Sequence, residues 1–278
     1  MKNPTYYNGV ITPFDNASIP LSDRSIFFSD AVYDVMIGRN NIPYQFTEHM
    51  ARLRDNCSKI ELSIPLGDAD ILETAEELVR LSGTDEFMLY LQVSGHSDRR
   101  IHNRTESIGN ILITVTEITV PNQPKRVRAI FFPDGRYGYC NLKTTNLLPA
   151  VLSMNAAVSA GADVAVFHRD NEITEASYAN VFILKKGRLV TPPLSNRILP
   201  GITRDNVIAT AKESGIECEE RYLSKDELLS ADAILLSSTT KLLQICTEID
   251  GQVVGGGCEK EIQSIFDAMY ENFSGSTV

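Results

Sequence analysis

Residues 139–152 read YCNLKTTNLLPAVL and contain one lysine, Lys143, but no other charged side chain. In the wider window between Arg136 and Asp163, Lys143 remains the only acidic or basic residue apart from tyrosines and a cysteine. A lysine amine becomes a nucleophile when it is partly removed from water or placed near other positive charge. The isolation of Lys143 makes it a candidate catalytic residue, and the competing interpretation is a strand-end lysine whose amine reaches solvent.

The sequence around Lys143 predicts a strand-rich α/β region. Short apolar, β-branched runs predict strands, and apolar residues at helical spacing predict helices. Lys186-Gly187 predicts a hairpin turn, and Thr203 is a candidate helix N-cap. The predicted strands are 127–132, 163–168, a hairpin over 180–190 and 233–240, and the predicted helices are 147–162, 203–215 and 258–273.

The first half of the chain has a different pattern. Asn8-Gly9 predicts a hairpin turn, and Thr47 is a candidate N-cap for the first long helix. Strands are predicted over 6–13 as a hairpin, 31–37, 87–95 and 110–120, and helices over 47–62 and 68–83. The stretch PNQPK, residues 121–125, is the best linker candidate, because prolines bracket its polar residues. We therefore predict an α+β domain over 1–120 and a strand-rich α/β domain over 121–278.

The composition disfavours several classes of partner. The chain has 278 residues, of which 43% are hydrophobic and 22% charged, an ordinary globular composition. The formal net charge of −10 disfavours binding to nucleic acid or anionic lipid. The five cysteines lack C-x-x-C spacing and the four histidines lack the i, i+4 spacing of a metal site. We expect a soluble, cytoplasmic protein with free thiols, no membrane span, no signal peptide and no bound metal.

Three further stretches contain side chains suited to charged ligands. Glu175, in ITEASYANVF (173–182), is placed to hold a cationic ring nitrogen, although it also suits an ordinary turn. RILPGITRDNV (197–207) opens a helix, and helix N-termini bind phosphate, although an ordinary loop and cap are commoner. LLSSTT (235–240) ends a strand in hydroxyls that suit a phosphate or carboxylate. A Schiff-base lysine, an acid for a pyridinium nitrogen and a phosphate cradle are together the requirements for pyridoxal phosphate.

The order and wording of these motifs resemble the class IV (fold type IV) pyridoxal-phosphate aminotransferases, and most closely the D-amino acid aminotransferases. DRSIFFSDAVYDV (23–35) is similar to the family's D-R…F-G-D-G-V-Y-E opening, and EHMARL (48–53) to its H-x-x-R-L helix. LKTTNLLPAVL (142–152), ITEASYANVF (173–182) and ILPGITRDNVI (198–208) match the three strongest blocks of the second half. The resemblance implies a smaller N-terminal α+β domain and a larger, strand-rich C-terminal α/β domain that forms a pseudo-barrel.

The resemblance also implies a role for each matching residue. Lys143 would form the Schiff base and then shuttle a proton at the substrate Cα, and Glu175 would keep the pyridine nitrogen protonated. Arg52 would bind the phosphate, although from its position alone it reads as one exposed helix charge among several. The other implied cofactor-binding residues are Leu199 at the ring face, Ile202, Thr203 and Thr239 at the phosphate, and Ser238 toward the substrate side.

A second motif bears on the substrate. In D-amino acid aminotransferases, an Arg-x-His pair after a strand and a tyrosine near the N-terminus bind the substrate α-carboxylate. Arg100, His102 and Tyr33 fit that pattern, and Thr240 would lie on the same side. A guanidinium fork matches a carboxylate with two hydrogen bonds. The competing interpretation is a basic solvent loop, because arginines crowd SDRRIHNR (97–104).

The chain departs from the family pattern near the substrate motifs. Ser94-Gly95-His96 stands where the family has T-R-G, and Tyr178 lies in a turn that is serine-rich in the family. In the opening motif, Ser29 and Ala31 replace two glycines. Tyr178 is bulky, and we expect it to reshape the pocket or to take over a hydrogen bond.

We therefore expect a transaminase that moves an amino group from a D-amino acid, such as D-alanine or D-glutamate, to 2-oxoglutarate or pyruvate. The resemblance also implies a homodimer in which the carboxylate-binding loop reaches the partner's site. Branched-chain L-amino acid aminotransferase and aminodeoxychorismate lyase are alternatives with the same fold, against which Arg100 and His102 argue. A non-catalytic pyridoxal-phosphate-binding protein and a cofactor-free scaffold are further alternatives, against which the intact Lys143 and Glu175 argue.

Overall fold

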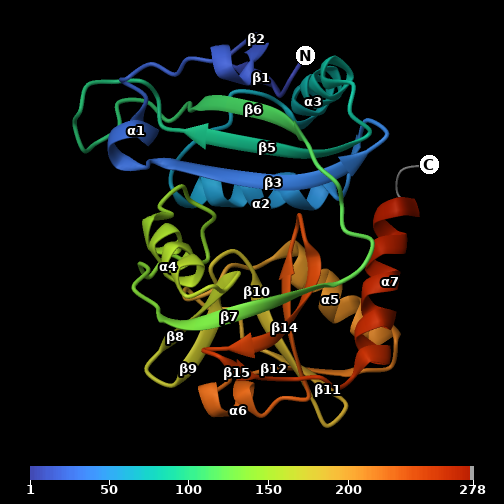
Figure 1. Ribbon diagram of the computed structural model, residues 1–278. Helices are drawn as coiled ribbons and strands as arrows, with labels where there is room; N and C mark the ends of the chain where they lie inside the picture. Colours follow the sequence, from blue (N-terminus) through green and yellow to red (C-terminus); the bar gives the residue numbers. More distant parts are fainter. Residues whose placement is uncertain (276–278) are drawn as a thin grey trace. The chain divides into compact units, whose positions relative to one another are not determined.

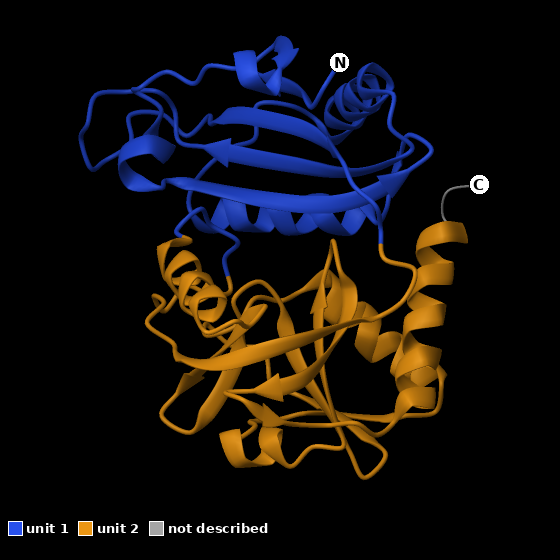
Figure 2. Ribbon diagram, viewed as in Figure 1, with its two compact units in different colours: residues 1–120, 142–146, 276–278 blue, residues 121–141, 147–275 orange. Residues whose placement is uncertain are grey.

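The computed structural model describes residues 1–275 as two compact units. Unit 1 comprises Met1–Val120 and Leu142–Asn146, and unit 2 comprises Pro121–Asn141 and Leu147–Gly275 (Figure 2). The chain leaves unit 1 at the start of the proline-bracketed stretch PNQPK. The short segment that contains Lys143 belongs to unit 1, although the sequence pattern places it in the second domain.

Unit 1 is built on a six-stranded antiparallel sheet with the strand order β2-β1-β6-β5-β3-β4 (Figure 1). Asn8 and Gly9 have φ of 45° and 94°, so the predicted hairpin turn is confirmed. The elements are β1 (Pro4–Tyr7), β2 (Val10–Pro13), a 3₁₀ turn η1 (Phe14–Asn16), α1 (Arg24–Phe28), β3 (Ala31–Arg39), β4 (Ile42–Pro43), α2 (Phe46–Lys59), α3 (Asp68–Ser82), β5 (Glu86–Ser94) and β6 (Asn110–Glu117).

The two faces of this sheet have different roles because side chains alternate along each strand. On one face, Val32 and Met36 of β3 pack with α2 and α3 in a single core. On the opposite face, Tyr33 lies beside Tyr90 and Gln92 of β5, which the antiparallel register places next to it. The sheet therefore separates an apolar core from a face that carries hydroxyl and amide groups.

Unit 2 is a strand-rich α/β unit around a nine-stranded mixed sheet, ordered β12-β11-β10-β13-β14-β7-β8-β9 with β15 beside β14. Three strand pairs are parallel, namely β11 with β12, β14 with β7, and β7 with β8. The elements are β7 (Lys125–Pro133), α4 (Leu148–Ser159), β8 (Val164–Arg169), β9 (Glu172–Ala176), β10 (Asn180–Lys185), β11 (Arg188–Thr191), α5 (Ile202–Glu213), β12 (Glu217–Glu220), α6 (Lys225–Leu229), β13 (Ala233–Ser238), β14 (Leu242–Ile249), β15 (Gln252–Val253) and α7 (Glu259–Gly275).

Both predicted threonine N-caps are wrong. Helix α2 begins at Phe46, after Gln45 in the left-handed region with φ 53°, so Thr47 lies inside its first turn. Helix α5 begins at Ile202 after Gly201, so Thr203 also lies inside the helix. In each case the helix extends N-terminally beyond the threonine, because the preceding residue provides the extended or left-handed backbone that starts it.

Three expectations from the sequence concern membrane-spanning helices, metal sites and disulfide bonds. Among residues 1–275, no helix is both long enough and apolar enough to cross a bilayer. In the same range, no group of three or more His, Cys, Asp or Glu side chains is arranged to hold a metal ion. All five cysteines are free thiols, of which Cys57 and Cys246 are buried.

Candidate functional site

Lys143 lies on a short segment that pairs with the edge of β3. Thr144 bridges to Val32, and the backbone N–H of Tyr33 donates to the carbonyl of Lys143 at 2.9 Å. The Lys143 amine lies 4.5 Å from the centre of the Tyr33 ring, which stacks on Tyr90 at 5.4 Å. Strand pairing thus brings the predicted nucleophile next to the predicted substrate tyrosine, within unit 1.

Arg52 of α2 is held by a buried carboxylate. Its Nε and a terminal nitrogen donate to the two oxygens of Asp34 at 2.8 and 2.7 Å, and His49 Nδ1 lies 2.7 Å from the same carboxylate. Burial alone would raise the pKa of Asp34, but hydrogen bonds from His49 and Arg52 hold it well below its usual range. Burial lowers the pKa of His49, so the ring is neutral near pH 7 and its Nδ1–H is assigned as the donor to Asp34. The guanidinium of Arg52 is therefore fixed in orientation.

Glu175 of β9 is a buried acid with every carboxylate oxygen engaged. One oxygen accepts from the backbone N–H of Leu199 at 3.0 Å and from Asn180 Nδ2 at 3.2 Å, and the other pairs with Arg136. Burial raises the pKa of Glu175, and the positive charge of Arg136 opposes that rise. The site therefore contains a carboxylate that is fixed in position and screened from water.

The sequence did not identify Arg136 as part of this site. Its Nε and a terminal nitrogen each donate at 2.9 Å to Asp134, and its guanidinium lies 4.5 Å from the Phe167 ring. It also donates to the carbonyl of Arg197 at 3.0 Å. The only signal in the sequence is that Arg136 closes the uncharged window around Lys143. Sequence analysis also did not identify Asp34, His49 and Asn180 as site residues. Their role is to hydrogen-bond to Arg52, to Asp34 and to Glu175, respectively, and these contacts form only in the folded chain.

Unit 2 also contains a cradle of unused donors. Gly201 precedes α5 without a side-chain cap, and a Cβ at this position would lie 2.2 Å from Asn180 Oδ1. At the end of β13, the hydroxyls of Ser237 and Ser238 are buried and have no hydrogen-bond partner. A helix N-terminus and free hydroxyls are the donors that an anionic group needs. Of the predicted residues, Ile202 and Thr203 open α5, while Thr239 and Thr240 directly follow β13.

Arg100 and His102 lie on the loop between β5 and β6, and both side chains are exposed. The Arg100 guanidinium lies 5.6 Å from the centre of the Phe28 ring, and the His102 ring centre lies 5.5 Å from it.

In unit 2, Tyr178 is 42% exposed and its hydroxyl lies 3.3 Å from Gln244 Oε1. The structure thus groups Arg100 with His102, Tyr33 with Lys143, and Glu175 with Leu199.

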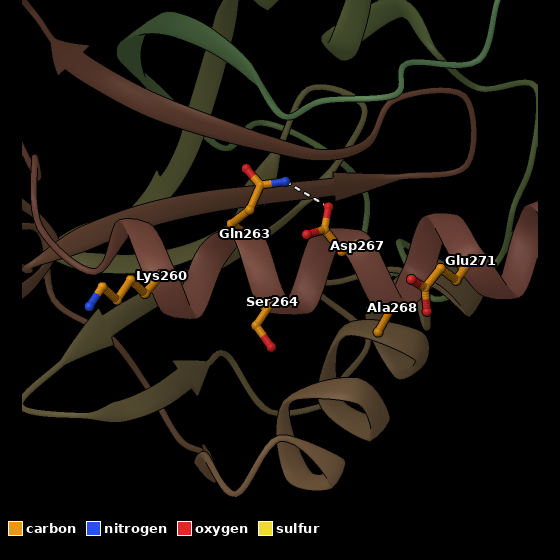
Figure 3. A pocket seen from close by; sticks show the side chains of 6 residues that line it. All are labelled: Lys260, Gln263, Ser264, Asp267, Ala268 and Glu271. Carbon is orange, nitrogen blue, oxygen red and sulfur yellow. Dashed lines mark hydrogen bonds between the residues drawn. The ribbon is translucent and has the colours of Figure 1, made fainter.

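A surface depression on α7 is not the candidate site. It is lined by exposed polar residues and by Ala268, all from one helix, and Gln263 donates to Asp267 at 2.7 Å (Figure 3). None of the predicted residues lies there, and a site formed by one solvated helix face has no means of excluding water from a reaction. The chemistry is better placed where buried carboxylates and unpartnered hydroxyls occur.

The comparisons with known proteins place this chain in a family. The sequence profile of class IV aminotransferases matches residues 31–249. The chain belongs to the class IV aminotransferases. It is 33% identical to a D-alanine aminotransferase of Bacillus licheniformis over 90% of each chain. Two structures of branched-chain aminotransferases share the fold. The structure from Thermoproteus uzoniensis with norvaline has a TM-score of 0.88 and 23% identity, and the match covers 96% of this chain and 93% of that chain. The structure from Escherichia coli has a TM-score of 0.88 and 22% identity, and the match covers 100% of this chain and 97% of that chain.

This class IV aminotransferase uses pyridoxal phosphate, and the predicted family, fold type and enzyme class are confirmed. The groups in each unit can be compared with the chemistry of the cofactor. Unit 1 has the Lys143 amine and the oriented Arg52 guanidinium. Unit 2 has the buried Glu175 carboxylate, the N-terminus of α5 and the unpartnered hydroxyls of Ser237 and Ser238. The groups of unit 2 therefore suit a cationic ring nitrogen and a phosphate.

Proposed function

We propose that this aminotransferase moves an amino group from a D-amino acid, such as D-alanine or D-glutamate, to 2-oxoglutarate or pyruvate. The observation that carries the proposal is the Arg100–His102 pair, which presents a guanidinium and an imidazole together on one aromatic ring. Such a pair suits the α-carboxylate that amino acid and keto acid share. The 33% identity to a protein named D-alanine aminotransferase supports the same substrate class.

The chain's own residues are proposed to divide the chemistry between them. Pyridoxal phosphate, when bound, supplies an aldehyde that condenses with amines and a ring that accepts electrons. Lys143 would hold the cofactor through its amine and would then move a proton to and from the substrate Cα. Glu175 keeps the ring nitrogen protonated, and its contacts with Leu199, Asn180 and Arg136 hold the carboxylate in place for that purpose.

The remaining groups are proposed to bind and orient. Arg52, fixed by Asp34, is a phosphate ligand together with the backbone at the start of α5. Ile202, Thr203, Ser238 and Thr239 would complete the cofactor-binding set, and the Leu199 side chain would contact the cofactor ring. Tyr33, Arg100, His102 and Thr240 bind the substrate. When the substrate carboxylate is held at a fixed point, only one enantiomer of the amino acid presents its Cα–H bond to Lys143. A site of this kind therefore selects the configuration at Cα.

The proposal is tested by the visible absorption spectrum of the purified holoenzyme. We expect D-alanine to convert the cofactor's absorption to that of the pyridoxamine form, and L-leucine in a parallel sample to leave it unchanged. Conversion by L-leucine alone would replace the proposal with a branched-chain aminotransferase. A yellow protein that neither acid changes would point to a lyase or a cofactor-binding protein.

We also propose that the enzyme is a homodimer, as the family resemblance implies. Helix α4 contains no charged residue. Its exposed side chains are the apolar Leu148, Val151, Leu152 and Val158 and the small polar Asn155 and Ser159. Several exposed apolar side chains on one uncharged helix are typical of an interaction surface. Light scattering at micromolar concentration should give about twice the 30.8 kDa mass of one chain, and a mass of one chain would contradict the proposal.

A further inference from the structure

A buried arginine binds the backbone of the loop that carries Arg100 and His102. Arg24, at the start of α1, is 4% exposed. Its terminal nitrogens donate to the backbone carbonyls of Ile101 at 2.7 Å and His102 at 2.9 Å, and one of them also lies 3.5 Å from the carbonyl of Asn103. A loop outside the sheet ladder needs such partners for its backbone groups. Arg24 therefore fixes the peptide planes within the proposed carboxylate-binding motif.

The charge of Arg24 is balanced by the carboxylate of Asp30, which also binds Arg104. Asp30 accepts from Arg24 Nε at 2.7 Å and from Arg104 Nε at 2.8 Å, so one carboxylate binds an arginine of α1 and an arginine of the loop. Burial alone would raise the pKa of Asp30, but hydrogen bonds from Arg104 and Arg24 keep it below its usual range. Asp30 therefore stays ionised at neutral pH, where it pairs with Arg24.

Gly95 explains how these groups come so close to the backbone. A Cβ at residue 95 would lie 2.8 Å from Asp30 Oδ2 and 2.9 Å from Arg24 Cδ. The space next to the backbone is thus occupied by the Arg24–Asp30 pair. This is one of the positions at which the chain departs from the T-R-G motif, so the departure has a structural reason within unit 1.

Phe28, at the other end of α1, gives the loop side chains a common surface. Its ring centre lies 4.6 Å from the Arg24 guanidinium carbon, 5.6 Å from that of Arg100 and 5.5 Å from the His102 ring centre. Cations are attracted to the face of an aromatic ring, and the ring restricts the rotamers available to a long side chain. The Phe28 ring therefore contacts both exposed side chains of the motif, and the Arg100 guanidinium carbon also lies 6.0 Å from the centre of the Phe27 ring.

We infer that Arg24 and Phe28 are positioning residues that set Arg100 and His102 to receive a substrate carboxylate. Arg24 fixes the backbone of the motif, and Phe28 fixes the direction of its side chains. Neither residue takes part in proton transfer. The inference rests on the proposed function, since it assigns Arg100 and His102 to the carboxylate. It predicts that substitution of Arg24 or Phe28 weakens binding of the substrate carboxylate and leaves the reaction with an amine that lacks a carboxylate unchanged.

The test compares ligands with and without a carboxylate on the holoenzymes of Phe28→Leu and Arg24→Lys. For Phe28→Leu we expect KM for D-alanine, and the inhibition constant of propanoate, to rise about 2- to 30-fold, with kcat nearly unchanged. Arg24→Lys should act in the same direction, because an ammonium cannot reproduce the guanidinium fork. The single-turnover rate with ethylamine, which lacks the carboxylate, should match wild type in both variants.

Matched controls come from exposed positions of unit 1. Phe14→Leu, at a 55% exposed ring, and Arg54→Lys, in an exposed pair with Asp68, should behave as wild type. An equal loss of rate with D-alanine and with ethylamine would show that Arg24 and Phe28 have a merely structural role. Unchanged values of KM for D-alanine and of the propanoate inhibition constant would also overturn the inference. If wild type itself does not react with D-alanine, the proposed function fails and the inference with it; if wild type reacts, the variants judge the inference alone.

Discussion

Replacing Lys143 with alanine is expected to lower the rate of amino transfer by at least about 1,000-fold, because one side chain provides both the covalent anchor and the proton carrier. The sequence near this residue contains no second amine that could replace it. Its amine lies on the Tyr33 ring, and no other lysine is present between Arg136 and Asp163. The measurement is the rate of pyruvate formation from D-alanine with 2-oxoglutarate as acceptor.

The fold should survive this substitution. The segment around Lys143 is held to β3 by backbone hydrogen bonds, including Tyr33 N–H to the Lys143 carbonyl and Thr145 N–H to the Ala31 carbonyl, which alanine retains. The thermal midpoint without cofactor should therefore stay near that of wild type. Lys260→Ala, at an exposed position of α7, is the matched control and should be fully active. Full activity of the Lys143 variant would remove the residue from the mechanism.

Replacing Glu175 with glutamine is expected to lower kcat by about 100- to 1,000-fold, the range seen when one preorganised electrostatic partner is removed. A neutral amide can still accept from Leu199 N–H, but it cannot stabilise a proton on the ring nitrogen. Arg136 keeps its two hydrogen bonds to Asp134, so no unpaired charge is left buried. The loss should therefore appear in kcat far more than in the unfolding midpoint.

A neighbouring carboxylate provides the control for this variant. Glu172 lies on the same strand, is 34% exposed at its side chain and pairs with Arg197 at 2.8 Å. Glu172→Gln should keep nearly full kcat under the same assay. A Glu175→Gln enzyme as fast as the Glu172 variant would show that the buried acid does not act on the ring nitrogen.

The sequence predicted those parts of the fold that depend on neighbouring residues. Both hairpins were correct, because Asn8-Gly9 and Lys186-Gly187 adopt the positive φ values that tight turns need. The helix after Lys143 was also correct, with Pro149 in its first turn. The two threonine caps were wrong, because Gln45 and Gly201 start the helices earlier than capping preferences alone would suggest.

The parts that sequence reasoning missed depend on contacts between distant residues. Arg52 looked like an exposed helix charge, yet its side chain is 10% exposed and is held by Asp34, which lies 18 positions earlier. Arg136 and Glu175 are 39 positions apart and meet because β7 and β9 belong to one sheet. Likewise, the segment of Lys143 joins unit 1 through pairing with β3, which no local pattern reveals.

The most direct test of the account is to locate the cofactor on the chain. The holoenzyme would be treated with borohydride, digested and analysed by mass spectrometry. We predict that the pyridoxyl group is found on the peptide that contains Lys143 and on no other lysine. A pyridoxyl group on a different lysine would contradict the central claim that the isolated lysine of residues 139–152 is the catalytic amine.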